Sequence, residues 1–397
     1  MLKKIALNEP SLDIDEIKSV TKCIESNWIS TAGELIKKFE NKISNYTGAK
    51  YAIACMNGTC ALQISLKILG VTKEDEVIVP TLTFISPISA VVLNNAKPIF
   101  MDVDNYHNID CKKVIEFIKK QTLFKNGCTF NKKTKKRIKA IIVVHVWGNA
   151  VDLKKLIKLC KKKNILLVED AAEGLGTKYK SSNLKNKHVG SIGVLGCLSF
   201  NGNKIITTGG GGMILTNNKF LSNKARYYIN QAKDNSVYYI HNEIGFNYRM
   251  TNLQAALGLA QLNKLKLFLH KKKIINLMYK KYLGNLINLK ILDNPKYSNN
   301  NNWMNILELS KNFPKSISQI INIFKKKNID LRPVWKLNHT QRPFLKYEKY
   351  KISNASKIYS NSLCLPSSVN LKDSEIKKIC KIISFISCED QKYLKIK

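Results

Sequence analysis

The apolar residues of this chain fall into short runs, and stretches with helical periodicity lie between many of them. Each run is bounded by turn-forming residues, which predicts buried strands. The predicted strands cover residues 51–55, 76–79, 98–102, 140–144, 165–168, 194–200 and 213–216. The predicted helices among them cover residues 61–69, 87–94, 152–162 and 219–231. This alternation predicts an α/β fold, with a mostly parallel central sheet and flanking helices.

The pattern changes in the last third of the chain. A long apolar-rich helix is predicted from Asn252 to about Tyr282, followed by a strand at 304–309 and helices at 316–327 and 373–387. We therefore predict a large domain, residues 1–285, and a smaller α+β domain, residues 286–397. Residues 1–30 are candidates to pack on the small domain. The polar, basic stretch 121–139 is predicted to be a surface loop.

The composition favours an ordinary globular protein over a membrane-spanning or disulfide-rich one. With 44% hydrophobic and 24% charged residues, the chain is of the ordinary globular type. Its start lacks the apolar region of a signal peptide, and its longest apolar runs are too short or contain prolines, so we expect no membrane span. The ten cysteines show no CxxC spacing, which indicates thiols in a reducing compartment. We expect a cytoplasmic protein without a metal site.

The net charge of +38 raises the question of nucleic-acid binding. Only five of the 66 basic residues are Arg, so the other 61 are Lys, and they are spread along the whole chain. Base recognition relies heavily on Arg, so a compositional bias explains the charge better than a nucleic-acid function does. A basic surface still favours a negatively charged substrate, such as a nucleotide-linked sugar.

The stretch 168–213 carries the strongest chemical signal. A predicted strand is followed by Asp170, and a later loop holds Ser199, Asn201 and Lys204 before four consecutive glycines. Burial disfavours the ammonium form of a Lys, and the neutral amine is the nucleophile. A carboxylate at a strand end can keep a pyridine nitrogen protonated, which makes the ring an electron sink. Together these residues predict a pyridoxal phosphate (PLP) site, with Lys204 as the Schiff-base lysine and Asp170 facing the ring nitrogen.

Other residues add to this site with alternatives left open. Gly58 and Thr59 lie between a predicted strand and a helix, where free N–H groups and a hydroxyl can hold a phosphate or simply cap the helix. Phe84 follows a predicted strand, where it can stack on a flat ring or belong to the core. His145, also after a strand, is better interpreted as a packed or hydrogen-bonded residue than as a catalytic base.

Four segments resemble one known family. NGTCALQISL, VEDAAEGLG, CLSFNGNKIITTGGGGMI and EIGFNYRMTNLQAALGLAQL are similar to the DegT/StrS family of PLP-dependent sugar aminotransferases, which have fold type I. The resemblance extends from about Ala6 to the C-terminus. SFNGNKIITTGGGG and HVWGNAVDL most resemble the subgroup that acts on UDP-linked 4-keto N-acetyl sugars in the bacillosamine and legionaminic acid pathways.

The resemblance implies a role for each candidate. The lysine and the acid described above match the Schiff-base lysine and the pyridine-nitrogen partner. Phe84 matches the aromatic residue that stacks on the ring, and Gly58, Thr59 and Ser199 match the phosphate cradle.

Three further residues are assigned to the cofactor. Asn201 lies in the lysine loop and is a cofactor-binding candidate. Glu173 stands where many relatives have Gln or His near the ring hydroxyl, so its role is open. Asn247 matches an Asn that reaches the phosphate from the second subunit of a homodimer.

The implied reaction is amino transfer from L-glutamate to C4 of a nucleotide-linked, UDP-type 4-keto-6-deoxy-N-acetyl hexose, for surface polysaccharide or glycan synthesis. Some relatives carry His in place of the lysine and dehydrate sugars, so the lysine favours amination. Trp28, Trp147 and Trp335, predicted in loops, are a weak sign of a bulky acceptor. The alternatives are a GDP- or dTDP-linked acceptor, or a non-enzymatic, DNA-binding regulator with the same fold.

Overall fold

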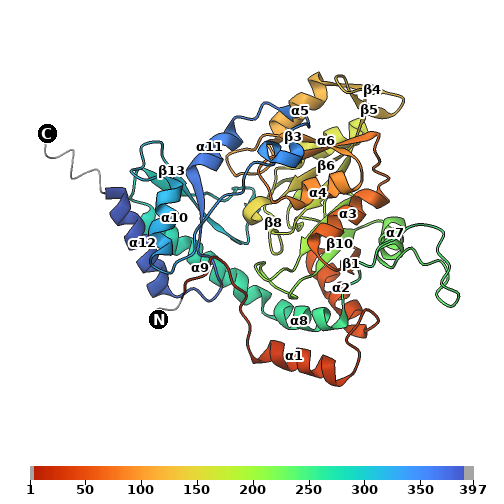
Figure 1. Ribbon diagram of the computed structural model, residues 1–397, viewed down its shortest axis with the longest axis horizontal. Coiled ribbons are helices and arrows are strands. Elements are labelled where there is room, and N and C mark those ends of the chain that lie inside the picture. The colour runs from red at the N-terminus through yellow and green to blue at the C-terminus, as the bar shows by residue number, and fades with distance from the viewer. Residues whose placement is uncertain (1–3, 389–397) are drawn as a thin grey trace.

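The computed structural model describes residues 4–388, and a mostly parallel sheet forms its centre (Figure 1). Along the sheet the strands follow the order β1-β10-β9-β7-β6-β2-β3-β15. Their bounds are β1 Tyr51–Cys55, β10 Gly212–Thr216, β9 Leu195–Ser199, β7 Leu166–Asp170, β6 Arg137–Val144, β2 Asp75–Pro80, β3 Lys97–Met101 and β15 Lys349–Tyr350. Only β10 runs antiparallel to its neighbours in this order. The predicted α/β class is confirmed, because apolar runs of this kind are stable only when both faces of the sheet are covered.

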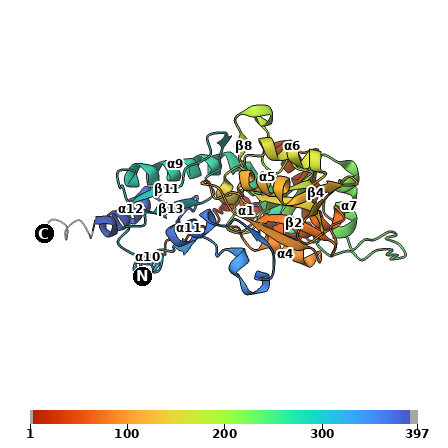
Figure 2. The ribbon, with the colours of Figure 1, turned by 90° about the horizontal axis from the view of Figure 1, so that it is seen from above.

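Helices supply that cover. The helices of the first part of the chain are α1 Ile14–Glu25, α2 Glu34–Thr47, α3 Gly58–Ile68, α4 Ser86–Leu93, α5 Cys111–Lys120, α6 Lys154–Lys163, α7 Lys219–Ile229 and α8 Asn252–Asn263. α3 packs on α4 and α7, whereas α5 packs on α6. Figure 2 shows α6 and α4 on opposite sides of the sheet. The sheet is therefore the middle layer of three.

The stretch 121–139 is not the surface loop that we predicted. It forms a hairpin, β4 Thr122–Lys125 and β5 Cys128–Asn131, and β5 extends the central sheet by pairing with β6. Asn126 and Gly127 make the turn with φ values of 50° and 71°, the left-handed conformation that a tight hairpin requires. The many lysines concealed this strand–Asn–Gly–strand signal.

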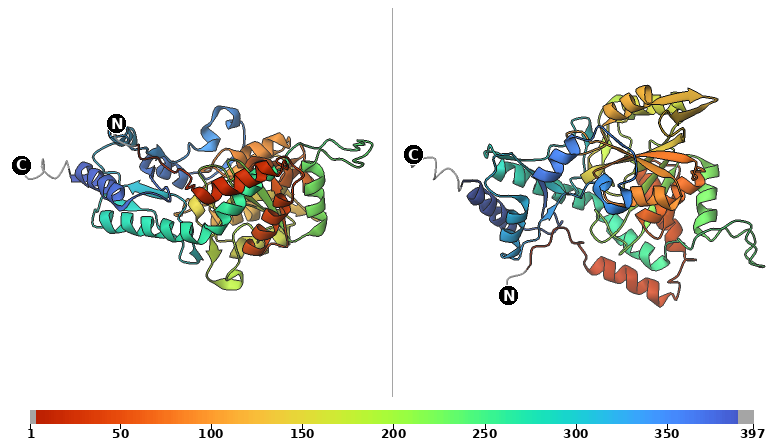
Figure 3. Two further views of the ribbon diagram at one scale, coloured as in Figure 1. Left: turned by 90° about the horizontal axis from the view of Figure 1, so that it is seen from below. Right: turned by 45° about the horizontal axis from the view of Figure 1, so that its top comes forward.

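The long predicted helix from Asn252 is two helices. The first is α8, which ends at Asn263, and the second is α9 Leu265–Leu283; Lys264 lies between them. The Lys264 amide donates to the carbonyl of Gln261, three residues back, and Lys264 Nζ contacts Glu16 at the start of α1 (2.8 Å). The break thus lies where the helix is tied to α1, and Figure 3 shows α1 alongside α8.

The C-terminal part builds a second, smaller sheet, in the order β11-β13-β16-β14. Its elements are β11 Leu289–Ile291, β13 Asn305–Leu309, β14 Arg332–Pro333, β16 Ser362–Leu365, and the helices α10 Ile317–Lys325, α11 Asn354–Asn361 and α12 Asp373–Cys388. A second hydrophobic cluster forms here around Tyr279 of α9 and Phe324 of α10, and it includes Ile5. Two short strands, β8 Lys178–Tyr179 and β12 Ser298–Asn299, pair with each other and join the two parts.

The predicted domain boundary between residues 285 and 286 stays a prediction. Residues 1–3 of the large domain and 389–397 of the small domain lie outside the described residues. Two observations show how the parts are joined: α9 contributes to the second cluster, and β15 returns to the central sheet. Of the first 30 residues, Ile5 pairs with Ile329 of the C-terminal part, whereas α1 lies against α8. Within residues 4–388 no helix has the length and apolar character needed to cross a membrane.

Candidate active site

One cavity of about 360 Å³ lies where several strands of the central sheet end. β7 ends there with Asp170 and β9 ends with Ser199, and the loop after β2 contributes Phe84. The sequence-predicted residues that line it are Gly58, Thr59, Phe84, Asp170, Glu173, Ser199, Asn201 and Lys204. The fold thus brings together residues separated by as much as 146 positions, at the sheet edge where ligands of open α/β sheets bind.

Lys204 reaches this cavity from the loop after β9. Its backbone N–H donates to the carbonyl of Asn201 (2.9 Å), which closes a tight turn. Its Nζ lies 3.4 Å from Glu173 Oε1 and 4.4 Å from the centre of the Trp303 ring. The amine is therefore held between a carboxyl group and an aromatic face, and only 14% of the side chain is exposed.

Asp170 is almost completely buried at the cavity wall. Burial raises the pKa of its carboxyl group, while the amide of Ala172, which donates to Oδ1 (3.0 Å), and the charge of Lys204 act in the opposite direction. A carboxylate in this position gains from a nearby positive group, which is what a protonated pyridine ring would provide.

Glu173 lies beside the lysine. Burial raises the pKa of its carboxyl group to about 7, despite the nearby charge of Lys204. Its Oε2 accepts a hydrogen bond from the backbone N–H of Trp147 (2.8 Å). Near neutral pH this side chain can therefore donate or accept a proton next to Lys204 Nζ.

The start of α3 lines the cavity and provides groups that could hold an anion. Gly58 is the first residue of α3, where backbone N–H groups are directed at the solvent or a ligand. A Cβ at this glycine would come within 2.9 Å of Ser199 Cβ, so a larger residue would fill the space. Thr59 Oγ1 and Ser86 Oγ lie 2.7 Å apart. Asn57 caps the helix through the Cys60 amide (2.8 Å), so capping and an anion site coexist here.

Aromatic rings form another wall of the cavity. Phe84 is 55% exposed, so it does not belong to the core, and its ring lies edge-on to Trp335 at 6.4 Å. Trp335 stacks on buried Trp147 at 4.0 Å, and Trp147 faces Trp303 at 6.2 Å. Of the three tryptophans singled out in the sequence, Trp335 lines the cavity, Trp147 lies behind it, and Trp28 is exposed elsewhere.

Sequence reasoning missed Trp303, Asn203, Thr83 and Ser86, all of which line the cavity. Trp303 follows the Asn run 299–302, which has no local pattern that indicates a site. Ser86 and Thr83 flank residues that were chosen, so their proximity in the sequence was the available signal. Trp303 could be identified only from the folded chain.

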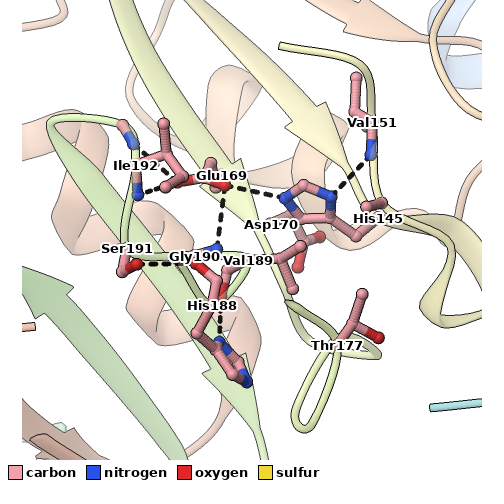
Figure 4. A network of polar contacts seen from close by, with 12 residues as sticks. His145, Val151, Glu169, Asp170, Thr177, His188, Val189, Gly190, Ser191 and Ile192 are labelled. Carbon is pink, nitrogen blue, oxygen red and sulfur yellow. Dashed lines mark hydrogen bonds and ion pairs between the residues drawn. The ribbon is translucent and has the colours of Figure 1, made fainter. Parts of the chain in front are cut away.

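His145 and Glu169 belong to a separate buried network of polar contacts (Figure 4), and neither residue lines the cavity. His145 Nδ1 accepts from the Val151 amide (3.1 Å), so Nε2 carries the proton and donates to Glu169 Oε2 (2.9 Å). Burial alone would raise the pKa of Glu169, but the hydrogen bonds from His145 and from the amides of Gly193 and Gly190 lower it. His145 is thus a hydrogen-bonded scaffold residue, the alternative that we preferred from the sequence.

Asn247 does not line the cavity of its own chain among the described residues. Its side chain is exposed, on a segment whose backbone pairs with Asn230 at the end of α7. Its predicted role in a second subunit stays a prediction.

The side chains in the cavity fit PLP. They provide an amine, a buried carboxylate and an anion cradle at a helix N-terminus, which are the groups that hold this cofactor in enzymes. The exposed Phe84 ring adds a face on which the flat cofactor ring could stack.

Comparison with known proteins identifies the family. A model of the DegT/DnrJ/EryC1/StrS aminotransferase family matches residues 10–384. A GDP-perosamine synthase of Escherichia coli O157:H7 is 35% identical, with 96% of this chain and 98% of that protein covered. A UDP-4-amino-4,6-dideoxy-N-acetyl-beta-L-altrosamine transaminase of Campylobacter jejuni is 29% identical, with 94% and 96% covered.

A solved structure agrees with this result. The DegT DnrJ EryC1 StrS aminotransferase from Brucella abortus has a TM-score of 0.84 and 25% identity, with 94% of this chain and 95% of that one covered. The chain therefore belongs to the DegT/DnrJ/EryC1/StrS aminotransferase family, as a PLP-dependent sugar aminotransferase.

Proposed function

We propose that this enzyme moves the amino group of L-glutamate to C4 of a nucleotide-linked 4-keto-6-deoxy hexose. The observation that carries the proposal is the position of Lys204 Nζ in the cavity, 3.4 Å from Glu173 Oε1. An amine there can take up and return a proton, which amino transfer between two substrates requires. The presence of lysine favours amination over dehydration.

The roles of the residues follow from their places. PLP, when bound, supplies a ring that accepts electrons as a substrate Cα loses its proton. Asp170 would face the ring nitrogen, because a buried carboxylate favours a positive partner. Lys204 would hold the cofactor in the resting enzyme and carry the Cα proton during transfer. Gly58, Thr59 and Ser199 would bind the phosphate.

The nucleotide of the acceptor is the open part of the proposal. The motif resemblance favours a UDP-linked N-acetyl sugar, whereas the relative that is 35% identical is named as a GDP-perosamine synthase. The relative named for a UDP-linked sugar is 29% identical. The net charge of +38 is compatible with either diphosphate. We therefore propose a UDP- or GDP-linked 4-keto sugar for surface polysaccharide synthesis.

The proposal includes a homodimer with shared active sites. The segment 233–245 projects from the body of the molecule beyond α7 (Figure 1) and leads into Asn247. Val237, Tyr238, Tyr239 and Ile244 on it are 71–87% exposed. Apolar side chains on a projecting segment favour burial against a partner, which would also bring Asn247 to that subunit's phosphate.

We also place the enzyme in the cytoplasm. The ten cysteines are free thiols, which is typical of a reducing compartment.

A substrate panel tests the proposed function. Purified enzyme, PLP and L-glutamate would be incubated with UDP-, GDP- and dTDP-linked 4-keto-6-deoxy sugars, and the products identified by mass spectrometry. We expect one acceptor to be aminated at C4, and Lys204→Ala to lower turnover by several orders of magnitude, because the nucleophile and the proton carrier are lost together.

A physical test complements the panel. Borohydride treatment of the loaded enzyme should attach the cofactor covalently to the peptide that contains Lys204. If no acceptor is aminated and Lys204 is not labelled, the proposed reaction and the proposed role of Lys204 are wrong.

A further inference from the structure

Lys272 is a buried lysine in the middle of α9, outside the cavity. Its side chain is 1% exposed, and Nζ donates to three oxygens: Asn8 Oδ1 (3.0 Å), the Trp303 carbonyl (3.0 Å) and the Ser367 carbonyl. These acceptors come from the N-terminal segment, the stretch before β13 and the stretch after β16. One amine therefore holds three distant parts of the chain at the junction with α9.

The acceptors are all neutral. Lys272 forms no ion pair within residues 4–388, and burial lowers the pKa of its amine to about 7. An apolar side chain would avoid this desolvation, because burying an amine without an acid partner is unfavourable. The three hydrogen bonds compensate for the desolvation of the amine, so the question is what they hold in place.

Two of the residues that Lys272 holds, Asn8 and Trp303, bond in turn to the loop that carries Lys204. The side chain of Asn8, held through Oδ1, donates from Nδ2 to the carbonyl of Asn203 (2.6 Å). The indole Nε1 of Trp303, held through its backbone carbonyl, donates to the same oxygen (2.6 Å). Asn203 immediately precedes Lys204 in the chain.

The contact with Trp303 has a direct effect as well. The centre of the Trp303 ring lies 4.4 Å from Lys204 Nζ. The hydrogen bond from Lys272 to the backbone of Trp303 therefore also fixes the position of the ring that the amine contacts. Asn276, one turn further along α9, bonds to Asn305 (2.9 Å) and secures the same stretch.

From these contacts we infer that Lys272 is a positioning residue, which holds the loop of Lys204 in place through Trp303 and Asn8. The inference rests on the proposed function, in which Lys204 is the reacting amine. Among the described residues, Lys272 is not one of those that line the cavity. A shift of about 1 Å at a reacting group can lower the rate about a hundredfold, so an indirect contact of this kind can control turnover.

The test compares Lys272→Met, which keeps the length and removes the donors, with Lys273→Met at the exposed neighbouring position. In the cofactor-free protein, the rate at which Lys204 is acylated by a small anhydride would be followed against pH by peptide mass spectrometry. In the loaded enzyme, kcat and the KM for glutamate would be measured. This labelling requires no substrate, so it remains valid if the proposed acceptor is wrong.

We expect Lys272→Met to change the pH profile of Lys204 labelling, and to lower kcat about tenfold or more with KM within about twofold. Lys273→Met should match the wild type in both. An unchanged labelling profile in folded Lys272→Met would overturn the inference and leave Lys272 a purely structural residue.

Two further variants apply if Lys272→Met does not fold. Asn8→Ala and Trp303→Phe each remove one donor to the Asn203 carbonyl. Both variants should shift the pH profile of Lys204 labelling in the same direction, and the double variant should shift it further. If neither shifts it, the inference is wrong.

Discussion

At the scale of single residues, Glu173 shows how burial and charge compete inside the cavity. Burial raises the pKa of its carboxyl group to about 7, although Lys204 lies 3.4 Å away and favours the carboxylate. The folded protein therefore binds a proton at Glu173 in a pH range where the unfolded chain, with a pKa near 4.5, has released it. Protonated Glu173 contributes stability that is complete below pH 4.5 and is lost as the pH rises through about 7.

This gives a prediction for Glu173→Gln in the cofactor-free protein. Gln cannot ionise, so the free energy of unfolding of the variant relative to wild type should rise by on the order of 1–3 kcal/mol between about pH 5 and about pH 8. Urea unfolding at both pH values measures the difference. Glu25→Gln, at an exposed position on α1, should show no such trend. Parallel behaviour of Glu173→Gln and wild type would mean that Glu173 is ionised throughout.

At the scale of elements, two adjacent residues of β7 have different roles: Asp170 lines the cavity, and Glu169 stabilises the surrounding fold. Successive side chains of a strand point to opposite faces, so Asp170 faces the cavity while Glu169 faces the loop that leads into β9. The Glu169 carboxylate accepts from the amides of Gly190 (2.9 Å), Ile192 (2.7 Å) and Gly193 (2.6 Å) (Figure 4). The position of β9, which ends in Ser199, thus depends on this buried acid.

We predict that Glu169→Gln lowers the free energy of unfolding by about 3 kcal/mol, because its amide group would turn an N–H toward at least one buried N–H donor. Urea denaturation measures the loss, and Glu34→Gln, at an exposed position on α2, provides the control. A loss below about 0.5 kcal/mol, the range of surface substitutions, would contradict the assigned role.

At the scale of the whole molecule, the proposed homodimer determines where each active site is completed. The cavity of one chain contains Lys204 but not Asn247, which lies on the segment beside α7. If Asn247 binds the phosphate in the partner, each site needs residues from both subunits. That arrangement can be tested by complementation.

Mixed dimers of Lys204→Ala and Asn247→Ala should recover activity. With shared sites, a mixed dimer has one site with both defects and one with neither, so equal mixing should restore about a quarter of wild-type activity. Mixing Lys204→Ala with Asp170→Asn is the control, because both residues line the same cavity and no site would be intact. If subunits exchange and no activity returns, Asn247 does not act across the dimer.

Much of the fold, and the central residues of the candidate site, could be predicted from the sequence alone. The strands of the parallel sheet, the strand-end position of Asp170 and the loop of Lys204 depend on local signals, namely apolar runs, turn residues and their order. Such signals survive without knowledge of distant contacts, because a buried strand must be apolar wherever it lies in the sheet. The Asn–Gly turn of β4 and β5 was also a local signal, and the lysines around it led us to a wrong interpretation.

Only the tertiary structure shows which residues from distant parts of the chain lie together around the cavity. Trp303 lies about 100 positions from the lysine loop that it contacts, and Asn301, in what the sequence presents as a plain Asn run, donates to the Glu173 carbonyl (2.6 Å) from a buried position. Lys272 is one of 61 lysines, and only its burial among three carbonyl and amide oxygens distinguishes it. These roles depend on contacts between residues far apart in the chain, which local periodicity does not record, so only folding could reveal them.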